Sequence, residues 1–365
     1  MGKFDMHREG SGPGAFFLTI STGAAAPKKI IRGLALQAMF ILAMMSVASV
    51  AIGQNGTELG RIAAQMKPGE WRELKTKGYG KELLTSGRSG IIAYSESAAW
   101  DAKSKSLHFI GQGHLSPPPK YISYWANTNE WKSEPCPKWL AKLKWFHSYD
   151  NNSCDSVNGR FFHRPSADRV FWQYDIGKKE WSQLPDLPSD APAGHGTATA
   201  FFPELGAKGS LFTFHAGKGH RFDMAKRNWQ PIPGDFSKAP LYHNIAEYNP
   251  RHKTVIFGGG NGSKQLFVID REGKIAAIKE TPCNIRVSSS HLMVCPASGE
   301  LLLLNYTKEE KGFWAIDLTA EKADWRKLAD APVWGGAVST ISTYGVIMHL
   351  NYQRVMIYKH AAVDK

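Results

Sequence analysis

Four histidines recur along the chain at a constant interval: His147, His195, His243 and His291 are separated by steps of 48 residues. An imidazole titrates near neutral pH and binds metal ions through a neutral nitrogen. A ring of equivalent imidazoles could therefore hold a metal ion, act as a general base or hydrogen-bond a ligand. A repeated backbone unit of the same length would produce the same spacing.

Only three of the four histidines fall at the same place in their unit. His147 and His195 lie eight residues, and His243 seven residues, before the turn that follows each of them, whereas His291 lies five residues before its turn. We therefore expect the first three at the starts of equivalent strands and treat the spacing of His291 as coincidental. Equivalent positions on three adjacent units lie on an arc, whereas zinc needs its nitrogen ligands at about 2.1 Å. A shared metal ion is therefore disfavoured.

Other polar residues are predicted to join these three histidines. A His or Asn follows the second strand of several units, and Arg286 precedes another first strand. The predicted ligand-binding residues are His147, His195, His243, Arg286, His163, His215, Asn305 and Asn351. A competing interpretation is that each histidine only hydrogen-bonds the backbone or water in a wet channel. We predict neither a metal ion nor a cofactor.

The elements that position these residues repeat with a period of about 48 after residue 66. The clearest marker is an aromatic or apolar residue, often followed by Asp, and then by a Trp; the copies end at Trp131, Trp181, Trp229 and Trp325. Short runs rich in β-branched and aromatic residues, split by Gly, Pro, Asn and Asp, are typical of strands. Four such runs per unit match a propeller blade, and six units start near residues 89, 145, 194, 242, 287 and 335.

The last unit lacks its Trp-containing strand, and a matching segment, GEWRELK around Trp71, precedes the first unit. Joining the two would close the ring and leave no open sheet edge. We therefore predict an all-β, six-bladed propeller with four-stranded antiparallel blades, in which a strand near Trp71 completes the last blade. The repeated Trp is predicted to pack between neighbouring blades.

This repeat resembles the kelch repeat of galactose oxidase-type propellers over about residues 67–365. The resemblance rests on Gly258-Gly259, on the pairs Tyr174-Asp175 and Phe222-Asp223, and on a Trp six residues after each Asp. Only one unit holds the diglycine in full. The copper site of galactose oxidase needs two Tyr and two His with a Tyr crosslinked to Cys, and this sequence has no matching cysteine context.

The resemblance also implies an alternative to simple binding. Six-bladed kelch propellers of the periplasm include sialic-acid mutarotases, in which polar residues at the channel rim move protons at the anomeric centre. By this resemblance His147, His195, His243 and Arg286 would be acid/base and carboxylate-binding groups. The chain contains no metalloprotease, serine hydrolase or nucleotide-binding motif that would identify another reaction.

Residues 1–51 differ from the rest. Lys28, Lys29 and Arg32 precede an apolar run that ends in Ser49-Val50-Ala51, the pattern of a secretory signal. We predict a leader and signal peptide over 1–51, cleaved after Ala51; an uncleaved anchor is the alternative. Residues 52–66 are predicted as a linker and 67–365 as the propeller. The protein would then be periplasmic, cell-surface or secreted.

Charge and cysteines add two further expectations. The net charge is +13, and the five basic and two acidic residues of 1–51 leave +10 for the remainder. Such a field attracts anionic polymers and acidic sugars. The sequence contains no run of five basic residues, so it gives no indication of a nucleic-acid partner. The possible disulfide cysteines are Cys136, Cys154, Cys283 and Cys295, for which an oxidising compartment permits two bridges in any of three pairings.

We therefore predict an exported, monomeric binding module that acts at its channel rim. The expected partner is an anionic carbohydrate or another envelope protein, and no nucleic acid; a membrane is expected only if the leader is an uncleaved anchor. The alternative is a carbohydrate-active enzyme, either sialic-acid mutarotase-like or galactose oxidase-like.

Overall fold

A computed structural model describes residues 56–86, 89–113, 116–142, 147–165, 168–191, 194–239, 242–287 and 289–363. They belong to one compact unit from Ile52 to Lys365. The predicted leader, 1–51, lies outside the described residues. Across the described ranges, no helix combines the length and the apolar character that crossing a membrane requires.

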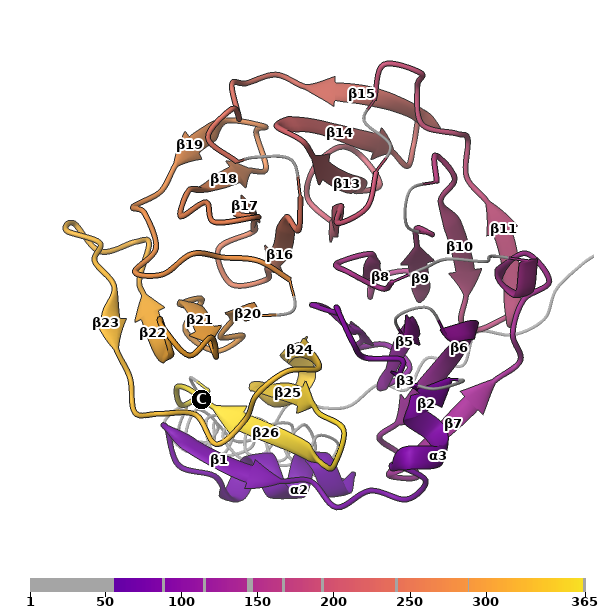
Figure 1. Ribbon diagram of the computed structural model, residues 1–365, viewed down its shortest axis with the longest axis vertical. Helices are drawn as coiled ribbons and strands as arrows, with labels where there is room; N and C mark the ends of the chain where they lie inside the picture. The colour runs from indigo at the N-terminus through magenta and orange to yellow at the C-terminus, as the bar shows by residue number, and fades with distance from the viewer. Residues whose placement is uncertain are drawn as a thin grey trace, which may run out of the picture. The chain divides into compact units, whose positions relative to one another are not determined.

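Six four-stranded antiparallel sheets stand side by side in a ring, and their innermost strands contact one another in sequence until the circle closes (Figure 1). We number these sheets blades I to VI in chain order. The innermost strands are β4 (Ala99–Asp101), β8 (Asn152–Asp155), β12 (Ala198–Phe202), β16 (Ile245–Asn249), β20 (Ser290–Val294) and β24 (Ala337–Ile341). This arrangement is a six-bladed β-propeller, as the repeat predicted.

The remaining strands of each blade follow outward in chain order. The second strands are β5 (Ser106–Gly113), β9 (Arg160–His163), β13 (Ser210–His215), β17 (Thr254–Gly258), β21 (Leu301–Asn305) and β25 (Val346–Leu350). The third strands are β6 (Ser116–Trp125), β10 (Trp172–Asp175), β14 (Lys218–Asp223), β18 (Leu266–Asp270), β22 (Gly312–Ile316) and β26 (Val355–Lys359). The outermost strands are β7 (Glu130–Glu134), β11 (Glu180–Gln183), β15 (Asn228–Ile232), β19 (Ile275–Ala277), β23 (Arg326–Lys327) and, in blade VI, β1 (Glu70–Glu73).

The ring is closed by the segment that the sequence singled out. Strand β1 pairs antiparallel with β26, and Trp71 lies opposite Tyr358. The Trp71 ring stacks on Tyr358 at 4.6 Å between centroids and contacts Phe313 of blade V at 6.0 Å. The predicted closure near Trp71 is therefore confirmed, and the early strand fastens blade VI to blade V.

The tryptophans of the outermost strands pack toward the preceding blade. Trp181 of blade II meets Tyr121 of blade I edge-on, with centroids 5.6 Å apart. The indole of Trp229 in blade III donates to the carbonyl of Pro185, at 2.7 Å, in the segment that follows blade II. Trp71 makes the same kind of contact, so the repeated Trp serves as an interblade packing residue.

Part of the segment 52–66, expected as a linker, forms helix α2 (Glu58–Gln65). Thr57 caps this helix by accepting from the Gly60 amide, and its hydroxyl donates to the Tyr344 hydroxyl at 2.9 Å. Tyr344 belongs to the short 3-10 helix η2 (Ser342–Tyr344), which follows the innermost strand of blade VI. The apolar face of α2 thus packs onto the propeller core.

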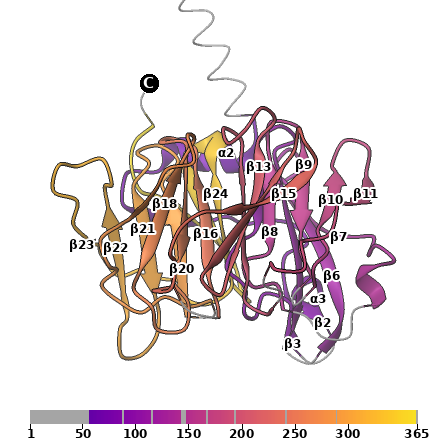
Figure 2. The ribbon, with the colours of Figure 1, turned by 90° about the horizontal axis from the view of Figure 1, so that it is seen from above.

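Short elements precede blade I and connect blades I and II. Helix α3 (Lys81–Leu84) leads into the hairpin of β2 (Thr85–Ser86) and β3 (Ser89–Gly90), and the 3-10 helix η1 (Leu140–Lys142) follows blade I. Seen from the side, the β2–β3 hairpin and α2 lie at opposite ends of the ring (Figure 2).

All four cysteines are free thiols, so the disulfides that the sequence permitted are not formed. Cys136 is exposed after blade I, whereas Cys154 lies in β8 and lines the channel. Cys283 and Cys295 are buried in two separate hydrophobic clusters. Cys283 and Cys295 therefore belong to different packing units.

Candidate functional site

The channel has two ends of different composition, set by the direction of the innermost strands. We call the end at which these strands begin the rim. His147, His195, His243 and Arg286 precede innermost strands and therefore lie there. The second strands run antiparallel, as in the pairing of Ala337 with Leu350, so residues that end second strands reach the same rim.

The three predicted histidines gather around one aromatic ring. The centroid of Tyr149 lies 5.3 Å from the His147 ring, 5.5 Å from that of His243 and 6.3 Å from that of His195. The centroid of the Tyr94 ring lies 4.8 Å from that of His147. We call these five residues the histidine rim; they bring imidazoles of blades II, III and IV to one face of the molecule.

The backbone holds the histidine rim in an unusual conformation. Tyr149 (φ 45°) and His243 (φ 61°) adopt left-handed angles, as does Gly196 (φ 71°) at the equivalent place of blade III. Bulky side chains rarely occupy this region, which glycine enters freely. Hydrogen bonds between neighbouring blades fix it: the Tyr149 amide donates to Tyr94, and the Tyr149 carbonyl accepts from Glu96, both at 2.9 Å. The rings are thus held by the closed circle of strands.

Burial keeps part of this cluster uncharged. It lowers the pKa of His243 to about 4, and Arg286 adds to the lowering while a hydrogen bond with Asn261 opposes it. Burial likewise lowers the pKa of His215 to about 4, helped by the nearby charge of Arg164. These two imidazoles are neutral near pH 7, so they act there as hydrogen-bonding groups and not as cations.

Two arginines contribute positive charge at the rim. Arg286 is exposed, and its guanidinium is held by the Ser289 hydroxyl at 3.0 Å beside a hollow of about 390 Å³ that is also lined by Asn261, Asn284, Glu309 and Glu310. Arg164 is fully buried; its Nε donates to the Asp168 carbonyl at 2.8 Å, and its Nη2 has no partner among the described residues. Both arginines act electrostatically on rim imidazoles.

The other predicted residues reach the same end but serve the protein itself. His163 Nδ1 lies 2.9 Å from the Asn152 side chain within the core. Asn305 caps its turn by accepting from the Thr307 amide at 2.8 Å, and Asn351 does so with Gln353 at the same distance. The structure thus brings His147, His195, His243, His215 and Arg286 toward one surface, and it uses His163, Asn305 and Asn351 in local bonding.

Exposed aromatic rings are concentrated at the rim. Among the described residues the exposed large hydrophobic side chains are Tyr94, Val157, Trp334, Tyr352 and Val363. Tyr94 and Trp334 precede the innermost strands of blades I and VI, and Tyr352 follows the second strand of blade VI. Trp334 is 57% exposed. Blades VI and I therefore add aromatic faces to a rim whose other half carries the imidazoles.

Below the rim, three carboxyl groups cross the channel between blades. The Asp150 carboxylate of blade II accepts from the Ala246 amide of blade IV at 2.5 Å. Glu247 of blade IV accepts from the Thr340 hydroxyl of blade VI at 2.8 Å. Glu96, ahead of blade I, reaches blade V, where it accepts from the Leu292 amide at 2.5 Å and lies 3.0 Å from His291 Nδ1. We call Glu96, Asp150 and Glu247 the carboxyl layer.

Burial shifts this layer toward its protonated form. It raises the pKa of Glu247 to about 8, and repulsion from Glu96 adds to the rise. Burial also raises the pKa of Asp150 well above its usual value, with Glu96 again contributing, and raises that of Glu96, where His291 opposes the shift. Uncharged carboxyl groups can sit close together in a narrow channel where three carboxylates would repel one another.

No group of three or more His, Cys, Asp or Glu in the described ranges is arranged to hold a metal ion. The carboxyl layer and the aromatic part of the rim escaped the sequence analysis. The layer had little signal in the sequence, because Glu96 and Asp150 lie in the segments ahead of β4 and β8 and only Glu247 is a single acid within a strand. Tyr149 lies two residues after His147, but nothing in its spacing marked it.

No family model and no curated protein matches this chain. Among solved structures it is similar to the structure of YjhT, with a TM-score of 0.43 at 12% identity over 56% of this chain and 71% of that chain. It is also similar to a chain in the crystal structure of the nidogen/laminin complex, with a TM-score of 0.47 at 11% identity over 74% and 87% of the two chains. Fold and site together define the class: a six-bladed β-propeller whose channel joins an aromatic, imidazole-rich rim to a layer of three carboxyl groups, two of them fully enclosed.

Proposed function

We propose that this protein is a binding module that takes an anionic carbohydrate at its histidine rim. The observation that carries the proposal is the concentration of exposed aromatic rings, Tyr94, Trp334 and Tyr352, at the same end as Arg286 and the imidazoles. Aromatic rings offer flat apolar faces for the C–H side of a sugar. Neutral imidazoles and amides supply hydrogen bonds to hydroxyl groups.

The charge of the rim favours an acidic sugar over a neutral one. Arg286 is exposed at the rim, so its guanidinium can meet a carboxylate with paired hydrogen bonds. Arg164 adds a buried positive charge, and the net charge of the chain is +13. A long-range positive field increases the rate at which acidic ligands arrive.

Calorimetric titration with N-acetylneuraminic acid, glucuronic acid and oligogalacturonate tests the proposal. We expect saturable binding of at least one of them, weakened by about tenfold or more in Trp334→Ala, because an exposed aromatic side chain at the centre of a contact contributes strongly. Val157→Ala is the control: Val157 is also an exposed apolar side chain but lies at the other end of the channel. Failure of every acidic probe to bind, or equal binding by Trp334→Ala, would overturn the proposal.

The second candidate is a carbohydrate-active enzyme at the same rim. It is supported by neutral imidazoles held near an arginine, since His243 is available as a proton acceptor near pH 7. NMR measurement of anomeric exchange in sialic and uronic acids separates the two functions. A binding module leaves the exchange rate unchanged; acceleration that disappears in the triple variant His147→Ala, His195→Ala, His243→Ala would establish the enzyme instead.

Export by the leader belongs to the same proposal, because acidic glycans are met outside the cytoplasm. Sequencing the amino terminus of the protein recovered from cells tests it. We expect a mature chain that begins near Ile52. A chain that still contains Lys28 and Lys29 would indicate that the leader is an uncleaved membrane anchor.

A further inference from the structure

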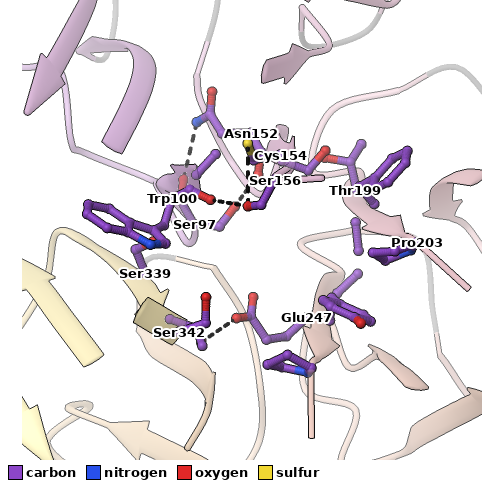
Figure 3. Close-up of a pocket in the computed structure, with 18 of the residues that line it drawn as sticks. Ser97, Trp100, Asn152, Cys154, Ser156, Thr199, Pro203, Glu247, Ser339 and Ser342 are labelled. Atoms are coloured by element: carbon purple, nitrogen blue, oxygen red, sulfur yellow. Dashed lines mark hydrogen bonds between the residues drawn. The ribbon is translucent and has the colours of Figure 1, made fainter. Parts of the chain in front are cut away.

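At the opposite end of the channel, we propose a second binding site, for a neutral polyhydroxylated molecule of about monosaccharide size. The site is the cavity formed where the innermost strands finish, beyond the carboxyl layer (Figure 3). It is separate from the histidine rim, and the inference does not depend on the function proposed for the rim.

The cavity has the size and lining that such a ligand needs. It holds about 260 Å³, just below the range of drug-sized pockets. Its walls come from blades I, II, III, IV and VI and present hydroxyl groups beside aromatic rings; the residues that matter here are Ser97, Trp100, Thr199, Tyr248, Ser339 and Thr340. Hydroxyls next to aromatic faces complement a sugar ring, which is polar at its edge and apolar on its faces.

Two polar residues of this wall can serve a ligand. Ser153 is 8% exposed and lines the cavity, and its Oγ, which is enclosed in the wall, has no hydrogen-bond partner in the described part of the chain. Rotation of this short side chain about χ1 would bring the hydroxyl to the cavity, where a ligand can satisfy it. Glu247 also lines the cavity and accepts from the Thr340 hydroxyl.

The charge of the cavity disfavours an anionic ligand. None of its described lining residues is Lys, Arg or His, and its two acids are Glu247 and Glu204. Glu204 accepts from the Tyr248 hydroxyl at 2.8 Å. Burial raises the pKa of Glu247 to about 8, so near pH 7 its carboxyl group is mostly protonated and donates a hydrogen bond, as a sugar hydroxyl requires. An acidic sugar would meet no positive charge here.

The carboxyl layer separates this cavity from the rim. Along blade II the order is Tyr149 at the rim, then Asp150 of the layer, then Asn152 and Ser153 on the cavity wall. Asp150 is fully buried and Glu96 is 2% exposed, and neither lines the cavity. The two ends are thus independent surfaces with different ligand chemistry.

The test uses D-galactose, D-mannose and myo-inositol as neutral probes and D-galacturonic acid as the charged comparison, by calorimetry or saturation-transfer NMR on the full chain. We expect at least one neutral probe to bind in a saturable way. Ser153→Leu fills the cavity and should abolish this binding. Ser153→Ala removes only the hydroxyl and should weaken it by about two- to tenfold, while Trp334→Ala at the rim should leave it unchanged.

A pH series supplies a readout that survives if Ser153→Leu does not fold. Titratable or charged groups around Glu247 are Glu96 and Asp150 of the layer, with Cys154, Glu204 and Tyr248 on the cavity wall. Binding to the natural protein should weaken by about tenfold between about pH 7 and about pH 9, and Glu247→Gln, which keeps an N–H donor, should bind equally at both. Absence of binding by all neutral probes, binding that survives in folded Ser153→Leu, or a pH effect unchanged in Glu247→Gln would overturn the proposal.

Discussion

The two ends of the channel are built by the same six strands yet differ in chemistry. At the rim, side chains project from loops: exposed Trp334 and Tyr94, imidazoles around Tyr149, and Arg286. At the other end the strands themselves form much of the cavity wall, whose described residues supply hydroxyl groups and two carboxyl groups but no basic side chain. The comparison shows that a repeated fold fixes positions, while the residues placed there decide which ligand each end takes.

The boundary between the two ends is the carboxyl layer, and disrupting it should have the largest effect. Asp150→Ala leaves the buried Ala246 amide without its acceptor, and we expect a loss of about 2–4 kcal/mol in the free energy of unfolding, measured by urea denaturation. Asp150→Asn keeps an acceptor oxygen and should cost less than half as much. Equal stability of Asp150→Ala and the natural protein would show that the layer does not join the blades.

Removing one ionisable group of the layer should change how stability depends on pH. The folded-state pKa of Glu247 is about 8, above the ordinary 4.5, so its stabilising contribution is complete below about pH 4.5 and is lost as pH rises through about 8. We expect the natural protein to lose on the order of 2–3 kcal/mol more than Glu247→Gln between about pH 5 and about pH 9. If the free energies of unfolding of the natural protein and Glu247→Gln changed equally with pH across this range, the raised pKa of Glu247 would be contradicted.

The contribution of the rim to stability should change with pH in the opposite direction. Burial lowers the pKa of His243 from 6.5 to about 4, so its contribution is complete above about pH 6.5 and is lost as pH falls through about 4. Because the ring is partly exposed, we expect His243→Gln to reduce the acid-side loss of stability by only about 1–2 kcal/mol. Thermal unfolding in an acid series measures this, and an unchanged acid limb would show that His243 is solvated.

The smallest effect concerns the charge of the rim. Arg286→Gln should weaken binding of an acidic saccharide by about two- to fivefold and reduce its salt dependence, because an exposed charge is screened within about 10 Å at moderate salt. Arg271→Gln is the matched control, since Arg271 is exposed on the turn after β18, away from the rim. If both substitutions weaken binding equally, the ligand is attracted by the overall positive charge of the protein and not by Arg286 in particular.

The ring was predictable because its signals repeat. The Trp that recurs in or beside the outermost strand of five blades, together with the segment around Trp71, gave the period and the closure. The end of the channel to which His147, His195 and His243 belong also followed from their distance to the next turn. Side-chain orientation did not follow: Asn305 and Asn351 share that end but turn back to bond their own backbone.

The parts that escaped prediction depend on contacts across the ring. Glu96 meets His291 from two blades away, across 195 residues of chain, and no local spacing encodes such a pair. The cysteines show the same limit, since their even count permitted two bridges, whereas all four are free thiols and Cys283 and Cys295 are buried in separate clusters. Trp334 became a candidate because it is exposed, and Ser153 because it is buried, and neither property could be read from the sequence.

One crossed titration tests the central claim that the two ends bind different ligands independently. An acidic and a neutral sugar are titrated into the natural protein, into Trp334→Ala and into Ser153→Leu. We predict that Trp334→Ala loses the acidic sugar alone and that Ser153→Leu loses the neutral sugar alone. Loss of both sugars in either folded variant, or of neither in both, would contradict the account.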